Sequence, residues 1–371
     1  MLFVYRKDES SSVIYSRYIT HAVEITDWNP HELLQCLQAL SVQVPEHLPL
    51  VVFPTNDPSL LAFIHIRAQL SPRFVDALPS PELVTLCLYK DRFYEYLSRN
   101  GVPHPRSIAL TKGGEISLAG NGQMPYPFAL KPALSHVFME KFHRKLFAVY
   151  SARELEMYCQ KISGQEISLI MQELIQGEEL HLIYFYVTRR GEASAVVGFR
   201  KIRQSPPDYG TASMVELYWN QELVERTLQL TRRLGYTGLG EAEYRYDPRD
   251  GEFKLLEINP RSNTFNRLSA RLGVDLEYQY YLDALGSLSC TNGVLHLRDK
   301  KARWVDFSKD IPTILALRQQ NRLPLGALLS SFRHLKMDGY FAVDDPAPFL
   351  YALKEFLKGG IRKKMAARES R

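Results

Sequence analysis

The sequence predicts a protein of mixed α/β and α+β class, and three observations support this prediction. The first 85 residues alternate short apolar strands with helix-like segments, which is typical of a parallel sheet. Residues 238–261 have the pattern of a β-hairpin, in which Ala242, Tyr244 and Tyr246 alternate with polar residues before a turn at Asp247–Gly251. The chain has 371 residues, enough for two or three compact lobes.

The composition and net charge of the chain limit the classes of function that it can have. Hydrophobic residues make up 45% of the chain and charged residues 23%, which is ordinary for a soluble globular protein. Residues 354–371 hold seven Lys or Arg and two Glu, and they account for the whole net charge of +5. The body is therefore near neutral, and we expect no nucleic-acid partner. We expect the basic tail to be a frayed, solvated end, with weak contact to an anionic partner as the alternative.

Cysteine spacing and hydropathy indicate a cytoplasmic protein. Cys36, Cys87, Cys159 and Cys290 lie far apart and form no CxxC pair, so neither a zinc site nor a disulfide framework is expected. No apolar run approaches the roughly 18 residues that span a bilayer, so we expect no membrane segment. The N-terminus lacks the pattern of a signal peptide.

The N-terminal elements follow one another as strands and helices. Residues 2–5, a segment within 20–28 and residues 50–53 are predicted strands, and residues 30–40 are a predicted helix. A further helix over 59–70 is expected to start with Asp57 as the N-cap and Pro58 at the first helical position.

The next segment contains two lysines of interest, one within a predicted helix and one at the end of a predicted strand. A helix is predicted over residues 81–99, with Lys90 in its middle and a stop at Asn100–Gly101. A strand over 126–132 ends at Lys131, which is followed by a proline. Taken alone, each lysine could simply be solvated. The stretch after Lys131 has no glycine, and Ser135 and His136 are candidates to hydrogen-bond a phosphate.

The middle of the chain predicts further strands and a basic loop. Strands are expected over residues 167–175, 182–188 and 195–199, and a helix over 220–234. Residues 200–207 begin with cations and continue into prolines, so we predict a loop that suits a carboxylate or an acyl phosphate. Arg203 is the preferred residue, and a solvated basic loop is the alternative.

The hairpin carries the strongest chemical signal. Glu257 and Asn259 share one face because side chains on a strand repeat every two residues, and Glu243 can lie opposite them. Two carboxylates and an amide oxygen form a hard ligand set that suits Mg²⁺, and Arg261 adds a cation. A plain amphipathic hairpin with a solvated acidic face is the alternative. Against it, Glu257 interrupts an apolar run, and a buried carboxylate needs a partner.

The stretch Glu257-Ile-Asn-Pro-Arg261 resembles the metal-binding end of the ATP-grasp ligases, especially carboxylate–amine ligases similar to D-aspartate ligase and carbamoyl phosphate synthetase. The resemblance runs from Lys90 to Arg261. It implies an ATP-grasp fold, in which two α+β lobes clamp ATP, preceded by a short parallel α/β domain. The domains expected from it are a shortened pre-ATP-grasp domain (1–85), the ATP-grasp domain (86–285, with lobes 86–170 and 171–285), and a closing segment with the basic tail (286–371).

The resemblance also implies roles for individual residues. Lys90 and Lys131 would contact the phosphates of ATP, while Glu243, Glu257 and Asn259 would bind Mg²⁺ or, alternatively, Mn²⁺. At the nucleoside, the expected residues are Gln172 or Glu173 for the adenine amino group, the backbone of Ile175 for the ring edge and Glu179 for the ribose. Arg261 and Arg203 would be the catalytic cations.

The function implied is an ATP-dependent carboxylate–amine ligase that forms an acyl phosphate and releases ADP and phosphate. Its substrates would be a small carboxylate and an amine, such as amino acids or peptides, and a homodimer is left open. The family's Gly-rich N-terminal turn is missing, so either the start codon is annotated late or this lobe is reduced. The alternatives are a phosphotransferase, or an ATP-binding protein with reduced catalysis.

Overall fold

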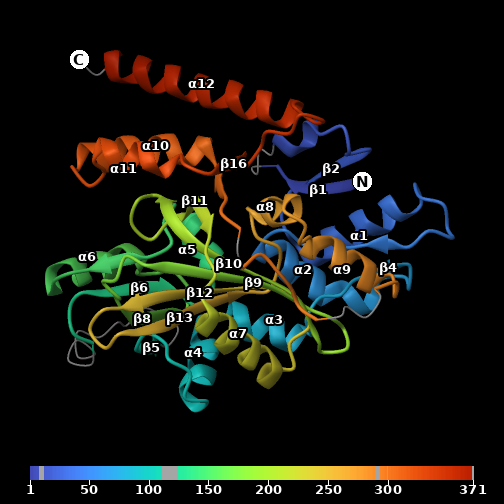
Figure 1. Ribbon diagram of the computed structural model, residues 1–371, viewed down its shortest axis with the longest axis horizontal. Coiled ribbons are helices and arrows are strands. Elements are labelled where there is room, and N and C mark those ends of the chain that lie inside the picture. Colours follow the sequence, from blue (N-terminus) through green and yellow to red (C-terminus); the bar gives the residue numbers. More distant parts are fainter. Residues whose placement is uncertain (8–11, 111–123, 289–292, 299, 370–371) are drawn as a thin grey trace.

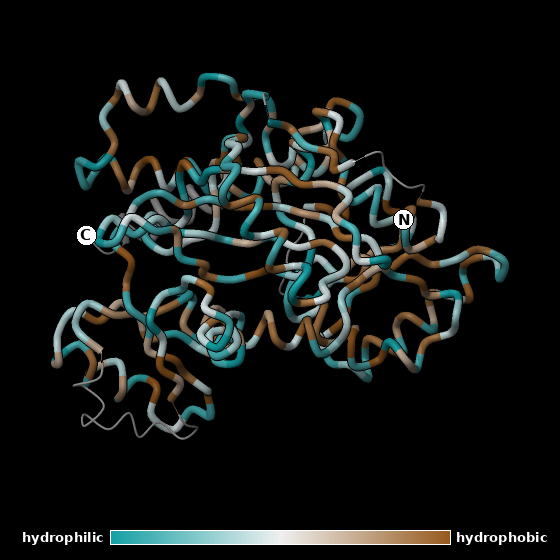
Figure 2. Tube along the Cα trace, turned by 60° about the horizontal axis from the view of Figure 1, so that its bottom comes forward, coloured by the Kyte–Doolittle hydropathy of each residue, from teal (hydrophilic) through white to brown (hydrophobic). Residues whose placement is uncertain are grey.

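The computed structural model of the chain describes residues 1–7, 12–110, 124–288, 293–298 and 300–369. A large sheet crosses the middle of the molecule, with helices α3 and α7 on one side and α8 and α10 on the other (Figure 1). A smaller sheet adjoins it, and the N-terminal elements lie at the opposite end. Apolar stretches are concentrated in the central strands, and the chain becomes hydrophilic at many of the connections (Figure 2).

The N-terminal elements form two separate parallel strand pairs, β1–β2 and β3–β4, which confirms the predicted parallel alternation. The elements are β1 (Leu2–Arg6), η1 (Ser12–Tyr15), β2 (His21–Ile25), α1 (Pro30–Ser41), β3 (Leu50–Val51), α2 (Asp57–Ile66), η2 (Arg67–Gln69) and β4 (Phe74–Val75).

The predicted cap of α2 is wrong by one residue. The N-cap is Asn56, whose Oδ1 accepts a hydrogen bond from the backbone N–H of Ser59 at 2.8 Å. Asp57 is the first helical residue and Pro58 follows it. The carboxylate of Asp57 is therefore not used as a cap and can bind a side chain elsewhere.

The single helix predicted over residues 81–99 is in fact two helices, α3 (Pro81–Leu88) and α4 (Lys90–Arg99). Tyr89 between them is extended, with φ −87° and ψ 104°. The backbone N–H of Lys90 donates to the carbonyl oxygen of Ala133 at 3.0 Å, a contact between distant segments that local sequence cannot reveal. Lys90 consequently starts a helix instead of lying in the middle of one.

The smaller sheet is antiparallel, with strand order β5-β8-β6-β7. Its core includes Phe128, Phe138 and Phe147, which are all buried. The glycine-free stretch after Lys131 contains a helix, α5. The elements are β5 (Ser107–Leu110), β6 (Phe128–Pro132), α5 (Ser135–Phe142), β7 (Phe147–Val149), α6 (Ala152–Ile162) and β8 (Leu169–Glu173).

The larger sheet has eight strands in the order β13-β12-β9-β10-β11-β15-β16, and β14 pairs with β10. Its elements up to the hairpin are β9 (Leu180–Val187), β10 (Ala193–Ser205), β11 (Thr211–Leu217), α7 (Gln221–Leu234), β12 (Gly238–Asp247) and β13 (Glu252–Asn259). Strand β9 is buried along its whole length. Leu182, Tyr184 and Tyr186 pack into one core, and the residues between them pack into a second core on the other face. Cover on both faces explains why this strand has no polar alternation.

The basic segment predicted as a loop over residues 200–207 is mostly the end of strand β10, which continues to Ser205. Its pairing with β11 shifts register between Lys201 and Arg203, and again between Arg203 and Gln204. Such a bulge places an extra residue in one strand and changes which face the following side chains occupy.

The predicted hairpin is confirmed as β12 and β13, in which Glu243 lies directly opposite Glu257 and Glu241 opposite Asn259. The chain then continues through α8 (Asn266–Arg271), α9 (Leu276–Ala284), β14 (Leu295–His296), β15 (Arg303–Val305), α10 (Phe307–Gln319), α11 (Leu325–Ser331), β16 (Leu335–Asp338) and α12 (Ala347–Glu369).

Residues 354–369 of the basic tail are helical instead of frayed, because they form most of α12, and residues 370–371 lie outside the described residues. None of the described helices is long and apolar enough to cross a membrane. Cys36, Cys87 and Cys159 are free thiols, while Cys290 lies outside the described residues.

Candidate functional site

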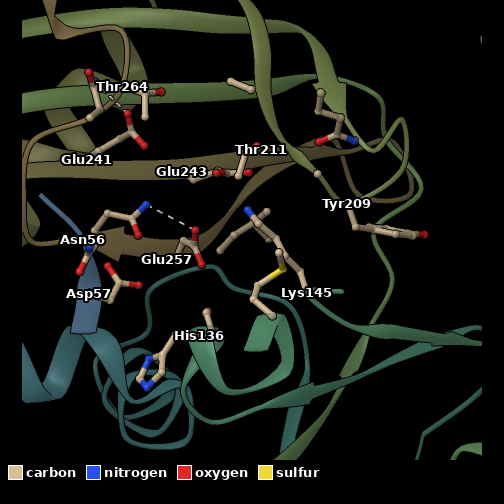
Figure 3. Close-up of a pocket in the computed structure, with 18 of the residues that line it drawn as sticks. Asn56, Asp57, His136, Lys145, Tyr209, Thr211, Glu241, Glu243, Glu257 and Thr264 are labelled. Atoms are coloured by element: carbon tan, nitrogen blue, oxygen red, sulfur yellow. Dashed lines mark hydrogen bonds between the residues drawn. The ribbon is translucent and has the colours of Figure 1, made fainter. Parts of the chain in front are cut away.

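A cleft of about 750 Å³ lies where the hairpin, the smaller sheet and the start of α2 meet, and we refer to it as the central cleft. Its walls bring together residues that are far apart in the sequence. Those predicted as site residues are Lys90, Lys131, Glu243, Glu257, Asn259 and Arg261. Figure 3 shows Asn56 and Asp57 approaching from the start of α2, and His136 from α5.

The two opposed carboxylates of the hairpin each hold a lysine. Lys90 Nζ donates to Glu257 Oε2 at 2.8 Å, and Lys201 Nζ donates to Glu243 Oε1 at 2.9 Å. Asn259 Nδ2 donates to the second oxygen of Glu257 at 3.4 Å. The positive charge of Lys90 holds the pKa of Glu257 well below its usual range, although burial opposes this. Both carboxylates are therefore prepared for a cationic partner.

The lysines of the cleft differ in their surroundings. Burial works to lower the pKa of Lys90, but the adjacent charge of Glu257 outweighs it and leaves the pKa raised. Lys131 donates to Gln172 Oε1 at 2.6 Å, and burial together with the charge of Lys90 lowers its pKa to about 7. Burial also lowers the pKa of Lys145, which forms no hydrogen bond or ion pair with any described residue. The cleft thus holds positive charge that the protein itself does not fully neutralise.

Two further groups complete the inner wall. Arg261 Nε donates to Asp57 Oδ1 at 2.6 Å, which holds the guanidinium against the cleft. Glu241 is buried and accepts a hydrogen bond from Asn263 Nδ2 at 2.9 Å. Burial, reinforced by the charge of Glu243, raises the pKa of Glu241 to about 7.

The start of helix α5 faces the same cleft. Ser135 and His136 both line it, and no side chain caps the first turn of the helix. Free N–H groups at a helix start favour an anion. The buried Nδ1 of His136 has no hydrogen-bond partner in the structure, so this wall has unused polar groups that a ligand could satisfy.

The residues predicted at the nucleoside do not line the central cleft as the structure has it. Gln172 is buried and its amide donates to Ser107 Oγ at 2.9 Å, while its oxygen accepts from Lys131. Glu173 binds the backbone N–H of Arg106 at 2.9 Å. The carbonyl oxygen of Ile175 accepts from Arg245 at 3.2 Å.

Glu179 is the fourth of these predicted residues, and half of its side-chain surface, 52%, is exposed. It lies beside Arg200 and His181 at the end of the connection to β9. Its role at a ribose stays a prediction, as do the roles of the other three.

The choice of Arg203 as a cleft residue is corrected. Its guanidinium points away from the cleft and forms a two-pronged ion pair with Asp310, at 2.8 and 2.6 Å, in a fully buried site. Ser331 Oγ also accepts from it at 2.7 Å. The bulge in β10 is the reason, since it places Arg203 on the face opposite Lys201.

Several cleft residues escaped the sequence reasoning. Glu241 lies two positions before Glu243 on one strand, so the two-residue repeat could have identified it. In the sequence, Lys201 is only one cation in a basic run. Lys145 follows α5 in a segment without any distinctive pattern, and Asp57 has the pattern of a helix cap. For Lys145 and Asp57 the sequence offers no signal.

The donor groups fit a magnesium ion that is shared with a polyphosphate. In the described part of the chain, no three His, Cys, Asp or Glu side chains gather into a complete ligand set. Magnesium usually takes only one or two carboxylates from a protein and completes its shell with phosphates and water. Glu243 and Glu257 supply two facing carboxylates, and the amide oxygen of Asn259 is a third oxygen nearby.

The chain is similar in sequence to several known proteins. Residues 212–285 match the family model described as the carbamoyl-phosphate synthase L chain, ATP binding domain. The chain is 24% identical over 208 residues to D-aspartate ligase of Enterococcus faecium, covering 53% of this chain and 49% of the relative. It is 29% identical over 206 residues to the carbamoyl phosphate synthase large chain of Rubrobacter xylanophilus, covering 53% and 19%. The chain thus spans about half the length, or less, of these curated relatives.

Among solved structures, the L-amino acid ligase of Bacillus licheniformis superposes with a TM-score of 0.58 at 16% identity, covering 78% of this chain and 68% of that one. The strand arrangement and the structural neighbours show an ATP-grasp fold. In sequence, the chain resembles D-aspartate ligase and a carbamoyl phosphate synthase large chain.

Proposed function

We propose that the chain is an ADP-forming carboxylate–amine ligase that uses ATP and Mg²⁺. One observation carries the proposal: a facing pair of carboxylates, Glu243 and Glu257, lies in one cleft with several cations. The cations that line this cleft include Lys90, Lys131, Lys145, Lys201 and Arg261. An acidic pair within a ring of cations suits a metal-bound polyphosphate, whose charge needs both kinds of partner.

The cationic and the acidic side chains of the cleft would bind different parts of the metal-bound nucleotide. Lys90, Lys131 and Lys145 would bind phosphate oxygens, with Ser135 and His136 at the start of α5 donating from the side. Glu243, Glu257 and Asn259 would hold the metal ion, which would supply positive charge against the negative charge that develops on the phosphates. Mn²⁺ has similar oxygen preferences and is the alternative ion.

The reaction proceeds through two displacements. A substrate carboxylate oxygen attacks the γ-phosphorus while the bond to the ADP oxygen breaks, which gives an acyl phosphate. The amine nitrogen then attacks the acyl carbon, phosphate leaves, and the nitrogen loses a proton. Arg261, held in place by Asp57, would bind the substrate carboxylate or the phosphoryl group. No side-chain nucleophile is required.

The relatives support amino acids or peptides as substrates. D-aspartate ligase and L-amino acid ligase are named for amino-acid substrates, and the cleft has fixed cations for a carboxylate. At the other end of the nucleotide, Gln172, Glu173, Ile175 and Glu179 remain the proposed nucleoside residues.

Phosphorus NMR tests the proposal directly. The purified chain is incubated with ATP, Mg²⁺ and a panel of amino acids and dipeptides, and the products are followed over time. We expect ADP and phosphate that depend on the panel, together with a new amide identified by mass spectrometry. A phosphorylated acid without an amide would indicate a phosphotransferase, and AMP with pyrophosphate would contradict the acyl-phosphate mechanism.

A further inference from the structure

A second cavity of about 520 Å³ lies between the N-terminal strands and the C-terminal helix, and we name it the aromatic chamber. Most of its large side chains are aromatic rings from β1, the β2–α1 connection and the region from β16 to α12. These rings are Phe3, Tyr5, Trp28, Tyr340, Tyr351 and Phe356. The volume lies within the range of about 300–1,000 Å³ that is common for small-molecule pockets.

The chamber adjoins the central cleft. Asn56 lines both cavities. On strand β1, Tyr5 lines the chamber and the next residue, Arg6, lines the cleft. At the start of α10, Ser308 and Lys309 are divided in the same way. A molecule with its reacting group in the cleft therefore has the chamber immediately beside it.

The most C-terminal part of the chamber wall comes from helix α12. It contributes Tyr351, Ala352 and Phe356 to the lining. The ring of Tyr351 stacks on that of Tyr15 at a centroid distance of 4.2 Å, which fixes the helix against the N-terminal segment. Figure 1 shows α12 beginning above β1 and β2.

The polar groups of the chamber indicate what it would hold. The side chain of Ser12 lines the chamber and is only 7% exposed, and its hydroxyl has no hydrogen-bond partner in the structure. Buried hydroxyls are normally paired, so this one suits a polar atom of a ligand. Among the described residues that line the chamber, Glu355 is the only charged one. None of these described lining residues is a lysine or arginine that could bind an acidic side chain.

We infer that the aromatic chamber receives the aromatic side chain of an amino-acid substrate whose reacting group lies in the central cleft. This inference rests on the proposed ligase function and names its substrate class. An aromatic ring would pack in offset or edge-on contact with the lining rings. An indole N–H or a phenol O–H would pair with the Ser12 hydroxyl, so tryptophan and tyrosine are favoured over phenylalanine, and all three over alanine or aspartate.

Binding and turnover are measured separately on the full chain, so that the two proposals can fail independently. Equilibrium dialysis gives dissociation constants for tryptophan, tyrosine, phenylalanine, alanine and aspartate in the presence of a non-hydrolysable ATP analogue and Mg²⁺. Ala352→Trp fills the chamber, and Leu353→Trp is the matched control, because Leu353 is an exposed neighbour outside the lining. Ser12→Ala removes the unpartnered hydroxyl with little change in volume.

We expect tryptophan to bind most tightly, and Ala352→Trp to weaken it at least tenfold, about 1.4 kcal/mol. Leu353→Trp should leave this binding unchanged, and neither variant should alter binding of the ATP analogue. Ser12→Ala should weaken tryptophan and tyrosine a few-fold and leave phenylalanine unchanged, which tests the chamber even if Ala352→Trp does not fold.

Equal binding of alanine and tryptophan, or an unchanged tryptophan affinity in folded Ala352→Trp, would overturn the inference. If only alanine or aspartate stimulates ADP release, the chamber assignment fails and the ligase stands. If tryptophan binds as expected but no amino acid stimulates ADP release, the ligase proposal fails and the binding site stands.

Discussion

Two cations on strand β10, only two residues apart, have different surroundings. Lys201 pairs with Glu243 in the wall of the central cleft, where 14% of the Glu243 side chain is exposed. Arg203 pairs with Asp310 behind the sheet, where the Asp310 side chain is fully enclosed. The two ion pairs are therefore of the same kind but differ in their surroundings. They differ in whether polar atoms of the pair remain free to bind a ligand.

Hydrogen bonding makes the difference explicit. In the buried pair, both oxygens of Asp310 accept from Arg203, and Ser213 Oγ also donates to it at 2.8 Å. In the cleft, one oxygen of Glu243 accepts from Lys201, and the opposed Glu257 is shared between Lys90 and Asn259. The first arrangement is complete in itself, whereas the second is the one that we propose to bind a metal ion and phosphates.

The substitution Glu257→Gln tests the role of the carboxylates in the central cleft, and it should have the largest effect. Loss of the charge should lower turnover by about 100-fold to 1,000-fold, the range seen when a group that stabilises the transition state is removed. The fold should persist because the amide keeps the shape of the carboxylate. ADP release and thermal unfolding are measured side by side, with Glu252→Gln at the exposed start of β13 as the matched control. A fully active Glu257→Gln protein would refute the metal assignment.

The substitution Arg203→Met tests the buried ion pair between Arg203 and Asp310. Removing one partner of a buried ion pair leaves the other charge uncompensated, so the free energy of unfolding should fall by about 3–5 kcal/mol. The affinity of the folded fraction for ATP should not change, since Arg203 does not line the cleft. Urea unfolding and nucleotide titration measure the two quantities. Unchanged stability with lost ATP affinity would place Arg203 at the site after all.

A smaller effect is expected from Asp57→Asn. Asp57 acts through Arg261, whose Nε it binds at 2.6 Å. The amide can still accept this hydrogen bond but lacks the charge, so we expect kcat/KM to fall about tenfold, which corresponds to 1.4 kcal/mol. Steady-state kinetics should show a rise in KM for the carboxylate substrate and little change for ATP. A loss of ATP binding instead would mean that Asp57 supports the nucleotide.

The smallest effect concerns the protonation of Lys131. Burial and Lys90 lower its pKa to about 7, Arg245 acts in the same direction, and Glu257 and Glu243 oppose them. At pH 8 the free protein therefore carries mostly neutral Lys131. Because bound phosphates favour the charged form, ATP binding should take up a proton, up to about one per site.

This proton uptake means that ATP affinity should decline as pH rises above 7. Calorimetric titration at pH 8 in two buffers of different ionisation enthalpy measures the uptake, and Lys131→Met gives the baseline. Equal uptake in the wild-type and variant proteins would show that Lys131 does not change its protonation.

The sequence predicted the elements whose evidence is local. The hairpin and the facing positions of Glu243 and Glu257 follow from two-residue alternation and turn chemistry, and the structure confirms them. The order of Lys90, Lys131 and the hairpin carboxylates sufficed to predict the ATP-grasp fold.

The remaining features depend on contacts between distant segments. The break at Tyr89 is set against Ala133, and the orientation of Arg203 depends on a bulge and on Asp310 more than a hundred positions away. Asp57 has the sequence of a helix start, but its neighbour Asn56 takes the cap and leaves its carboxylate to Arg261. Such choices are made by tertiary packing, which local patterns do not record.

The central claim is that a carboxylate attacks the γ-phosphate of ATP in this cleft. The most direct measurement follows oxygen: the acid that stimulates ADP release is labelled with ¹⁸O in its carboxyl group and incubated with ATP, Mg²⁺ and the amine. An acyl phosphate predicts that one ¹⁸O appears in the released phosphate, visible as an isotope shift in phosphorus NMR. Label found in AMP, or phosphate released without label, would contradict the account.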